Sequence, residues 1–407
     1  MKVDMPATPS ILIAGGGIGG LAVALALARV GRAVHIIERA AGDSVAGAGI
    51  QLGPNAVKVL RRLGIDAAVG AVASEPEALI IRAGATGGIL SRMQLGHEIA
   101  RRHGAPYWVV HRADLQRVLM RAVAAEAAVA IRGGCSVETV SLPDAGGVRV
   151  TLSDGTQLDG VALIGADGLW SNVRTWIQPG YLPVPSGYCA FRALIPAAQA
   201  GVLASSVVGA WLSPSAHVVH YPVRGGSEIN VVVVVRDGAV LEAWNSEAPT
   251  GQVIAAVAGF APELVRALAA APGWQKWSLA EPVDLQTWTR GPVALLGDAA
   301  HAMLPFFAQG GAMALEDAAV LAQCVSMRGD NLLAAFEHFA GLRRARVERV
   351  QAASSANGRI FHLSGASALA RDAALRLMPQ AVLQARFDWL YGFQCHEGLP
   401  TSAAKPK

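Results

Sequence analysis

The chain has 407 residues, of which 53% are hydrophobic and 16% charged, and its formal net charge is +4. This composition predicts a globular protein of two or three domains with a large core, and it excludes an extensively disordered chain. Because the net charge is small for the length and no basic run stands out, we expect no nucleic-acid partner, whereas an anionic small ligand is easily accommodated.

The four cysteines lie far apart and form neither a C-x-x-C pair nor a His-rich cluster. This spacing favours a reduced, cytoplasmic setting without a structural metal site. Residues 11–30 are apolar enough for a signal or membrane segment, but five glycines in their first half argue against both. No later run reaches about 18 uncharged apolar residues, so we expect no membrane anchor.

Residues 10–38 predict a strand, a Gly-rich turn, a helix and a second strand. Gly15, Gly17 and Gly20 form G-x-G-x-x-G, which allows a tight turn, close approach of the backbone to a pyrophosphate, and close packing of helix on strand. Glu38 ends the second strand, where a carboxylate can accept hydrogen bonds from ribose hydroxyls. The pattern predicts dinucleotide binding; the alternative is a Gly-rich turn used only for packing.

The following elements alternate between helix and strand. Residues 54–65 and 111–126 predict helices, residues 78–95 two short strands, and residues 161–168 a buried strand. Between about 180 and 280, strand-like runs separated by Pro and Gly turns predict a mainly antiparallel sheet. Residues 292–301 return to a strand and turn, and from about 312 the sequence is helical.

This order predicts an α/β fold in which a sheet domain is inserted into a discontinuous Rossmann-type domain. We expect the dinucleotide-binding domain to comprise residues 1–75, 105–180 and 281–335. The inserted, mainly antiparallel sheet domain comprises residues 76–104 and 181–280. A C-terminal helical region covers residues 336–407.

The run GDAAHAMLPFFAQGGAMALEDAA, residues 297–319, joins an Asp-His pair to a Gly-Gly step before a helix. Asp298 can bind a polyol, although a plain turn role is the alternative. Gly310 and Gly311 open the helix, whose free N–H groups can stabilise negative charge on a ring placed close to them. For His301 we favour a supporting hydrogen bond over the role of a base.

The segment AHVVHYPVR supplies a second candidate site. On a strand, His217 and Tyr221 point to the same face and His220 to the other. An imidazole and a phenol on one face can bind and deprotonate a phenolic substrate. The alternative is a pair of polar residues on a half-exposed sheet face.

Four motifs in this order resemble the FAD-dependent aromatic hydroxylases, single-component flavin monooxygenases of the p-hydroxybenzoate hydroxylase type. They are IAGGGIGG with Glu38-Arg39, HRADL with Arg112, GADGLWSNVR with Asp167, and GDAAH…P…QGG…ED. The resemblance spans roughly residues 10–345 and is strongest to the salicylate, 3-hydroxybenzoate and 6-hydroxynicotinate hydroxylase branch.

The resemblance implies FAD as cofactor and assigns residues to its parts. Glu38 and Arg39 lie at the adenosine ribose, Arg112 at the pyrophosphate, Val137 offers its backbone to the adenine, and Asp298 binds the ribityl chain. Asp167 lies in a motif linked to contact with both FAD and NAD(P)H, and its alternative role is an Asx cap in a turn.

The resemblance also implies a reaction. NADH or NADPH and O2 are co-substrates, and a C4a-hydroperoxide of the flavin hydroxylates a small phenolic or hydroxypyridine-type acid that His217, with Tyr221, deprotonates. The same resemblance suggests Gln51, Pro305 and Phe306 as pocket residues. The sequence departs from the family at two of them: 6-hydroxynicotinate enzymes carry a functional His at the position of Gln51, and 3-hydroxybenzoate 6-hydroxylases carry a Gln at that of Pro305.

Several alternatives stay open. Arg192 pairs either with a substrate carboxylate or with an acidic side chain on the surface. A related enzyme acting on a larger natural product and a flavin-binding redox protein without turnover are the competing functions. We expect a monomer or a homodimer.

Overall fold

The computed structural model describes residues 10–42, 48–236, 246–281 and 285–394. Its first sheet has six strands in the order β18-β19-β11-β1-β2-β7. All neighbouring pairs are parallel except β18–β19. The strands are β1 (Ile11–Ala14), β2 (Val34–Glu38), β7 (Val129–Gly133), β11 (Ala162–Gly165), β18 (Thr289–Arg290) and β19 (Val293–Leu295). The predicted strands at 10–38, 161–168 and 292–301 are therefore neighbours in one sheet.

Helices cover this sheet. Helix α1 (Ile18–Arg29) follows β1 and packs against α5 (Arg112–Ala124) and α10 (Gly310–Arg328). Helix α10 also contacts α2 (Pro54–Arg62), which Pro54 begins. The apolar side chains of α1 are buried, because the helix lies between the sheet and two other helices. These helices confirm the predicted strand–turn–helix order.

Shorter elements complete this part of the molecule. Strands β8 (Val137–Ser141), β9 (Val148–Leu152) and β10 (Gln157–Gly160) form an antiparallel sheet, and β3 (Gly49–Leu52) pairs with β6 (Trp108–His111). Short helices connect the strands: α3 (Asp66–Gly70), α4 (Gly96–His103), α6 (Asn172–Ile177) and α9 (Asp298–His301).

The second large sheet has eight strands in the order β16-β17-β12-β15-β14-β13-β4-β5. Only β4–β13 is a parallel pair, so the expectation of a mainly antiparallel sheet is confirmed. The strands are β4 (Ala78–Ala83), β5 (Ile89–Gln94), β12 (Pro185–Pro196), β13 (Val207–Leu212), β14 (Ala216–Val223), β15 (Glu228–Arg236), β16 (Ser246–Ala248) and β17 (Trp274–Ala280).

The two faces of the eight-stranded sheet have different neighbours. Helices α7 (Thr250–Ala256) and α8 (Pro262–Ala269) pack on one face, over a core that contains Trp211, Val218 and Val231. Alternate side chains of the same strands point to the opposite face, which lines a cavity. One face of the sheet therefore packs in a hydrophobic core, and the other face forms part of the cavity wall, where a ligand can bind.

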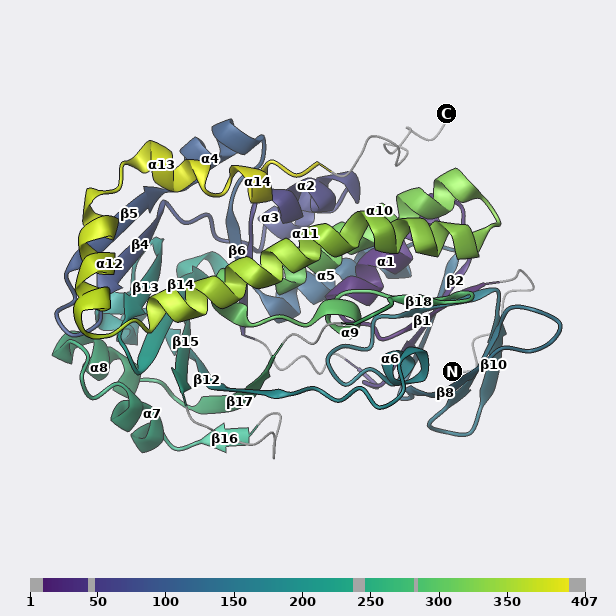
Figure 1. The fold of residues 1–407 in the computed structure, drawn as a ribbon, viewed down its shortest axis with the longest axis horizontal. Helices are drawn as coiled ribbons and strands as arrows, with labels where there is room; N and C mark the ends of the chain where they lie inside the picture. Colours follow the sequence, from purple (N-terminus) through teal and green to yellow (C-terminus); the bar gives the residue numbers. More distant parts are fainter. Residues whose placement is uncertain (1–9, 43–47, 237–245, 282–284, 395–407) are drawn as a thin grey trace.

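The last described elements are helices that lie against both large sheets (Figure 1). Helix α11 (Leu332–Phe361) has 30 residues and runs from α10 and β19 toward the eight-stranded sheet. Helices α12 (Gly365–Leu377) and α13 (Gln380–Ala385) contact β5, and α14 (Asp388–Tyr391) contacts α2. Position 336, the expected start of the C-terminal region, lies inside α11.

In the described ranges no helix is both long enough and apolar enough to cross a membrane. Cys135 and Cys324 are buried free thiols, and Cys189 is also buried. Among the described side chains, no group of three or more His, Cys, Asp or Glu could hold a metal ion.

Candidate active site

A cavity of about 1380 Å³ extends from the turn after β1 to the inner face of the eight-stranded sheet. Every residue that the sequence analysis assigned to cofactor, substrate or catalysis lines it, with the exception of Gly20. The cavity therefore brings together groups from the six-stranded sheet, the eight-stranded sheet and the C-terminal helices.

The glycines of the first turn have distinct structural roles. Gly15 has φ +100°, and a Cβ there would lie 2.5 Å from the Ala166 carbonyl oxygen. A Cβ on Gly20 would collide with the Gly15 carbonyl, so Gly20 serves the packing of helix on strand and not the cavity surface. Gly17 has open space around it and precedes α1 without a side-chain cap. The first N–H groups of α1 are therefore available to an anionic ligand.

Glu38 lies at the end of β2, as expected, and its carboxylate is held by backbone groups. It accepts hydrogen bonds from the N–H of Gly16 at 2.5 Å and of Ala40 at 2.8 Å. Val137 lines the same end of the cavity, where its carbonyl accepts a hydrogen bond from Asn172 Nδ2 at 2.9 Å.

Asp167 forms the turn cap considered for it and also faces the cavity. Burial raises its pKa, while hydrogen bonds from Ser171 and Val173 act in the opposite direction. The Ser171 hydroxyl donates to Asp167 Oδ1 at 2.5 Å and the Val173 N–H to Oδ2 at 3.3 Å. The carboxylate thus caps the turn before α6 and also lines the cavity.

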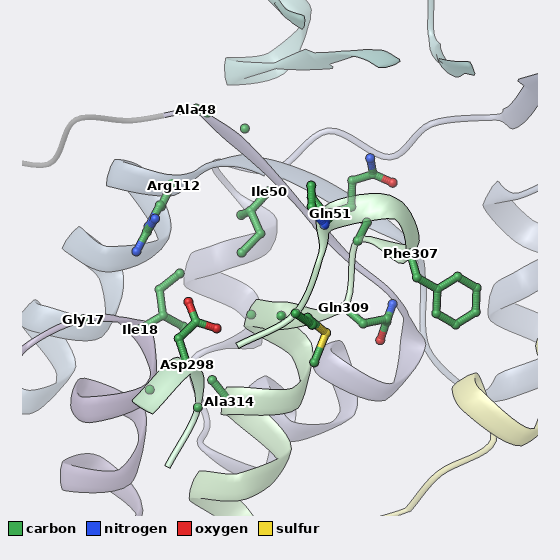
Figure 2. Close-up of a pocket in the computed structure, with 18 of the residues that line it drawn as sticks. Gly17, Ile18, Ala48, Ile50, Gln51, Arg112, Asp298, Phe307, Gln309 and Ala314 are labelled. Atoms are coloured by element: carbon green, nitrogen blue, oxygen red, sulfur yellow. The ribbon is translucent and has the colours of Figure 1, made fainter. Parts of the chain in front are cut away.

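Asp298 and the start of α10 lie at the centre of the cavity. Figure 2 shows Asp298 between Ile18 and Gln309, with Ile50 above it. A Cβ on Gly310 would lie 3.8 Å from Asp298 Oδ1, whereas one on Gly311 would collide with the Ile50 side chain. Because no side chain caps α10, its first N–H groups are available to a partly negative ring.

Behind the start of α10 lies a buried group of charged residues that sequence analysis missed. His301 Nε2 and Asp317 Oδ2 are 2.5 Å apart, and Arg343 donates from Nε to Asp317 Oδ1 at 2.6 Å and from Nη1 to Glu316 Oε2 at 2.7 Å. Burial would raise the pKa of Asp317, but His301 and Arg343 lower it to about 2. His301 does not line the cavity, which agrees with a supporting role.

This group also holds the cavity wall in place. Asp317 accepts from the N–H of Gly297, next to Asp298, at 3.0 Å. Asn55 Nδ2 donates to both Glu316 and Gln309, at 2.8 and 3.0 Å. The signal in the sequence was the pair Glu316-Asp317 inside an apolar helix, because acidic residues are rarely buried without a partner.

At the other end of the cavity, His217 and Tyr221 share one face of β14, as predicted, and His220 lies on the opposite face. Their exposed fractions are 2% and 3%, so the alternative of a half-exposed polar pair is wrong. Burial, with a smaller effect of the neighbouring His362, lowers the pKa of His217 to about 3. Burial raises the pKa of Tyr221, so its hydroxyl stays protonated.

The predicted pocket residues lie beside this pair. Phe306, in the short helix η4 (Pro305–Phe307), packs edge-on against His217 with ring centroids 5.4 Å apart. The Gln51 amide oxygen accepts a hydrogen bond from the Tyr107 hydroxyl at 2.5 Å. Tyr107 was not predicted, because its approach to Gln51 depends on the pairing of β3 with β6.

Arg192 points into the cavity from β12. Its guanidinium lies over the Trp277 ring, 5.2 Å from the centroid, and its Nε is buried without a hydrogen-bond partner. Burial lowers the pKa of Arg192, and the positive charge of Arg112 adds to this effect. No acidic side chain of the described residues pairs with it. The surface salt bridge considered for Arg192 is therefore not formed within the described residues.

Aromatic residues of the C-terminal segment form a further wall that was not predicted. Phe307 stacks on Phe387 and on Trp389, at centroid distances of 5.8 and 6.3 Å. Phe387 also stacks on Tyr391 at 5.3 Å. The cluster FDWLYGF in the sequence was the available signal, but the partner on η4 could not be inferred from it.

Comparison with known proteins agrees with this geometry. The FAD binding domain family matches residues 8–351. The 3-hydroxybenzoate 6-hydroxylase of Polaromonas naphthalenivorans (strain CJ2) is 33% identical over 392 residues, which cover 96% of this chain and 97% of that protein. The 6-hydroxynicotinate 3-monooxygenase of Pseudomonas fluorescens is 35% identical over 362 residues, covering 87% and 92%.

The fold of this chain also resembles that of solved structures. The crystal structure of Klebsiella pneumoniae HpxO complexed with FAD and uric acid has a TM-score of 0.82 and 26% sequence identity, and the match covers 94% of this chain and 96% of that one. The chain belongs to the FAD binding domain family. It is a flavoprotein monooxygenase of the aromatic-hydroxylase type with FAD as cofactor, which confirms the resemblance found in the sequence.

The residues present fit FAD. Two helices begin at the cavity without side-chain caps, and the glycines at both starts leave room for close approach. A carboxylate at the end of β2 and another at the start of α9 can accept hydrogen bonds from hydroxyl groups. The cavity continues beyond these groups to His217, which leaves space for a second molecule.

Proposed function

We propose that this protein hydroxylates a small phenolic or hydroxypyridine-type carboxylic acid, with NADH or NADPH as reductant and O2 as oxidant. The observation that carries the proposal is the buried pair His217 and Tyr221, on one face of β14, in the same cavity as the turns that fit FAD. Bound FAD would accept a hydride from the nicotinamide and deliver one oxygen atom of O2 to the aromatic ring.

Residues along the cavity have complementary roles toward the cofactor. Glu38 and Arg39 would hold the adenosine ribose, and the backbone of Val137 the adenine. Gly15, Gly17 and Arg112 would contact the pyrophosphate, which the start of α1 also attracts. We assign the ribityl chain to Asp298 and the negative edge of the ring to the N–H groups of Gly310 and Gly311. Asp167 would contact both FAD and the docking nicotinamide.

His217 is the proposed base. Because burial lowers the pKa of His217, its imidazole is neutral at physiological pH, so one ring nitrogen has a lone pair that faces no competing proton. This nitrogen can accept a hydrogen bond, and then the proton, from a phenolic hydroxyl. The transfer creates an imidazolium next to a phenolate, so the dry pocket gains no net charge. The phenolate ring is electron-rich at its ortho and para carbons, where oxygen transfer occurs. Tyr221, whose hydroxyl stays protonated, can donate a hydrogen bond to the anion.

Arg192 supports an acidic substrate. A guanidinium inside an apolar cavity with a buried, unpaired Nε fits a carboxylate, since charge-assisted hydrogen bonds are strong where water is excluded. Two relatives are named for hydroxylated aromatic acids, 3-hydroxybenzoate and 6-hydroxynicotinate. Gln51, Pro305 and Phe306 would border the ring and select its size.

The decisive experiment is a panel of aromatic acids with the purified FAD-loaded enzyme. We expect 3-hydroxybenzoate, 6-hydroxynicotinate or a related hydroxy acid to stimulate NAD(P)H oxidation and to yield a product heavier by one oxygen atom in mass spectrometry. Benzoate and 3-methoxybenzoate, which have the carboxylate but no phenolic hydroxyl, serve as controls. If no hydroxylated acid gives an oxygenated product, the proposal is wrong, and a flavoprotein without turnover or an enzyme for larger natural products takes its place.

A variant pair tests the base. His217→Ala should lower the hydroxylation rate by about 10²-fold or more while FAD stays bound, because a general base contributes about 10²–10⁴-fold. His220→Gln is the matched control, since His220 is also buried on β14 but lies on the face away from the cavity. Equal turnover in both variants would remove His217 from the catalytic role.

A further inference from the structure

His217 has a buried partner that belongs to neither the cofactor site nor the substrate pocket. His217 Nδ1 lies 3.1 Å from His362 Nε2, within hydrogen-bond distance. His362 is the C-cap residue that follows α11, it is 8% exposed, and it does not line the cavity. Two neutral imidazoles at this distance share one hydrogen, so one ring must donate and the other accept.

The proposed role of His217 decides which ring donates. Burial and the charge of Arg236 lower the pKa of His362 to about 4, so its ring is neutral and has one N–H and one lone pair. His362 Nδ1 is buried without a hydrogen-bond partner among the described residues, so the contact with His217 is the hydrogen bond that can orient the pair. A base must present a lone pair to its substrate, so His217 needs its hydrogen on Nδ1, with His362 Nε2 as the acceptor.

We propose that His362 is a positioning residue that fixes the tautomer of His217. His217 then carries its hydrogen on Nδ1, donated to His362, and its Nε2 presents a lone pair for the phenolic proton. This inference rests on the proposed function of His217 as the base. In the other tautomer Nε2 would carry the hydrogen and could not accept a proton from substrate.

The proton balance is simple. The substrate O–H bond breaks, the proton forms a new bond to His217 Nε2, and the electron pair stays on the phenolate oxygen. The resulting imidazolium keeps its Nδ1–H donated to His362. After hydroxylation the same proton returns to a phenolate oxygen of the product, which restores neutral His217. The hydrogen displaced from the ring carbon is lost separately as a proton and ends in the water that contains the second oxygen atom of O2.

The packing around His362 holds its ring in place. Tyr188 of β12 stacks on it with ring centroids 5.4 Å apart, and Phe306 packs edge-on at 6.2 Å. The charged groups that face it are Arg236 of β15 and Arg371 of α12, and both oppose its protonation. His362 therefore stays neutral at physiological pH, so one of its ring nitrogens keeps a lone pair that can accept.

The tautomer is read directly by ¹⁵N NMR of FAD-loaded protein labelled at histidine, with His217→Gln used to assign the signals. In the wild type we expect His217 Nδ1 protonated and Nε2 unprotonated. His362→Leu removes the acceptor and should shift the hydrogen toward Nε2. His362→Gln keeps an amide oxygen that accepts from Nδ1–H, so it should preserve the wild-type tautomer.

Turnover of the panel acid that the wild type hydroxylates gives the second readout. We expect kcat to fall at least about 10-fold in His362→Leu and to be largely restored in His362→Gln, with the FAD content unchanged. A wild-type His217 protonated at Nε2 would refute the inference, as would equal kcat in both variants. Either result refutes the inference alone, because the wild type still forms product. If the proposed function itself is wrong, the wild type forms no product from any acid.

Discussion

Replacing Asp317 by Asn tests the buried charge group behind the cofactor site. The carboxylate has three donors around it: the Gly297 N–H and His301 on Oδ2, and Arg343 on Oδ1. An amide has nearly the same shape but offers only one acceptor oxygen. In either orientation its NH₂ group faces a donor, and Arg343 loses one of its two negative partners.

The expected loss of folding stability in Asp317→Asn follows from the burial of the ion pair. The side chains of Asp317 and Arg343 are 0% and 1% exposed, and breaking a buried ion pair by removing one partner costs about 3–5 kcal/mol. The pKa of Asp317 points in the same direction, since His301 and Arg343 lower it below the ordinary value although burial acts to raise it. Because this pKa is lowered in the folded state, the contribution is present above pH 4 and is lost as the pH falls toward 2.

Urea unfolding of the apoprotein, followed by circular dichroism, measures this cost, and flavin fluorescence measures the affinity for FAD. We expect a lower free energy of unfolding and weaker FAD binding, because Asp317 holds the turn at Gly297 that presents Asp298. Asp159→Asn is the matched control: Asp159 also accepts from an arginine, Arg149, at 2.6 and 2.8 Å, but on the surface. If the two variants unfold alike and bind FAD alike, the reasoning from burial is wrong.

Three further predictions concern the substrate end of the cavity. Arg192→Gln should weaken binding of a hydroxybenzoate about 10- to 100-fold, as lost hydrogen bonds to a charged group predict, but should leave binding of phenol unchanged in the same titration. Gly358→Ala places a Cβ 2.5 Å from the Phe306 ring, which packs against His217, so this ring must shift and KM should rise more for larger acids than for smaller ones. Because burial keeps His217 neutral down to about pH 3, kcat/KM for a phenolic acid should show no loss near pH 6.5 on the acid side, and a fall centred there would contradict this assignment.

The parts of the site that could be predicted from sequence are those set by local geometry. Gly15 requires a positive φ and Gly20 requires the absence of a side chain, so a short motif identified the turn and its helix. The period of two along β14 placed His217 and Tyr221 together without knowledge of the neighbouring strands. The position of Asp298 at a helix start could be inferred because the strand, the turn and the helix lie in one short segment.

The parts that could not be predicted depend on contacts between distant segments. Arg343 reaches Asp317 only because α10 and α11 pack side by side, and His362 reaches His217 only because α11 ends beside β14. In the sequence, His362 is one histidine near the end of a long amphipathic segment. Tyr107 and Phe387 likewise reached the cavity through strand pairing and ring stacking, which no local pattern encodes.

Helix α11 links the cofactor end of the cavity to the substrate end. Arg343, near its middle, braces the turn that presents Asp298, while Phe361 at its end packs edge-on against His217 at 5.2 Å. These two residues are about 27 Å apart along the helix axis at 1.5 Å per residue. A helix resists changes in length far better than a loop does, so α11 sets the distance between the turn of Asp298 and His217. In the proposed mechanism the C-terminal helices therefore belong to the catalytic architecture, because α11 aligns two sites that separate sheets provide.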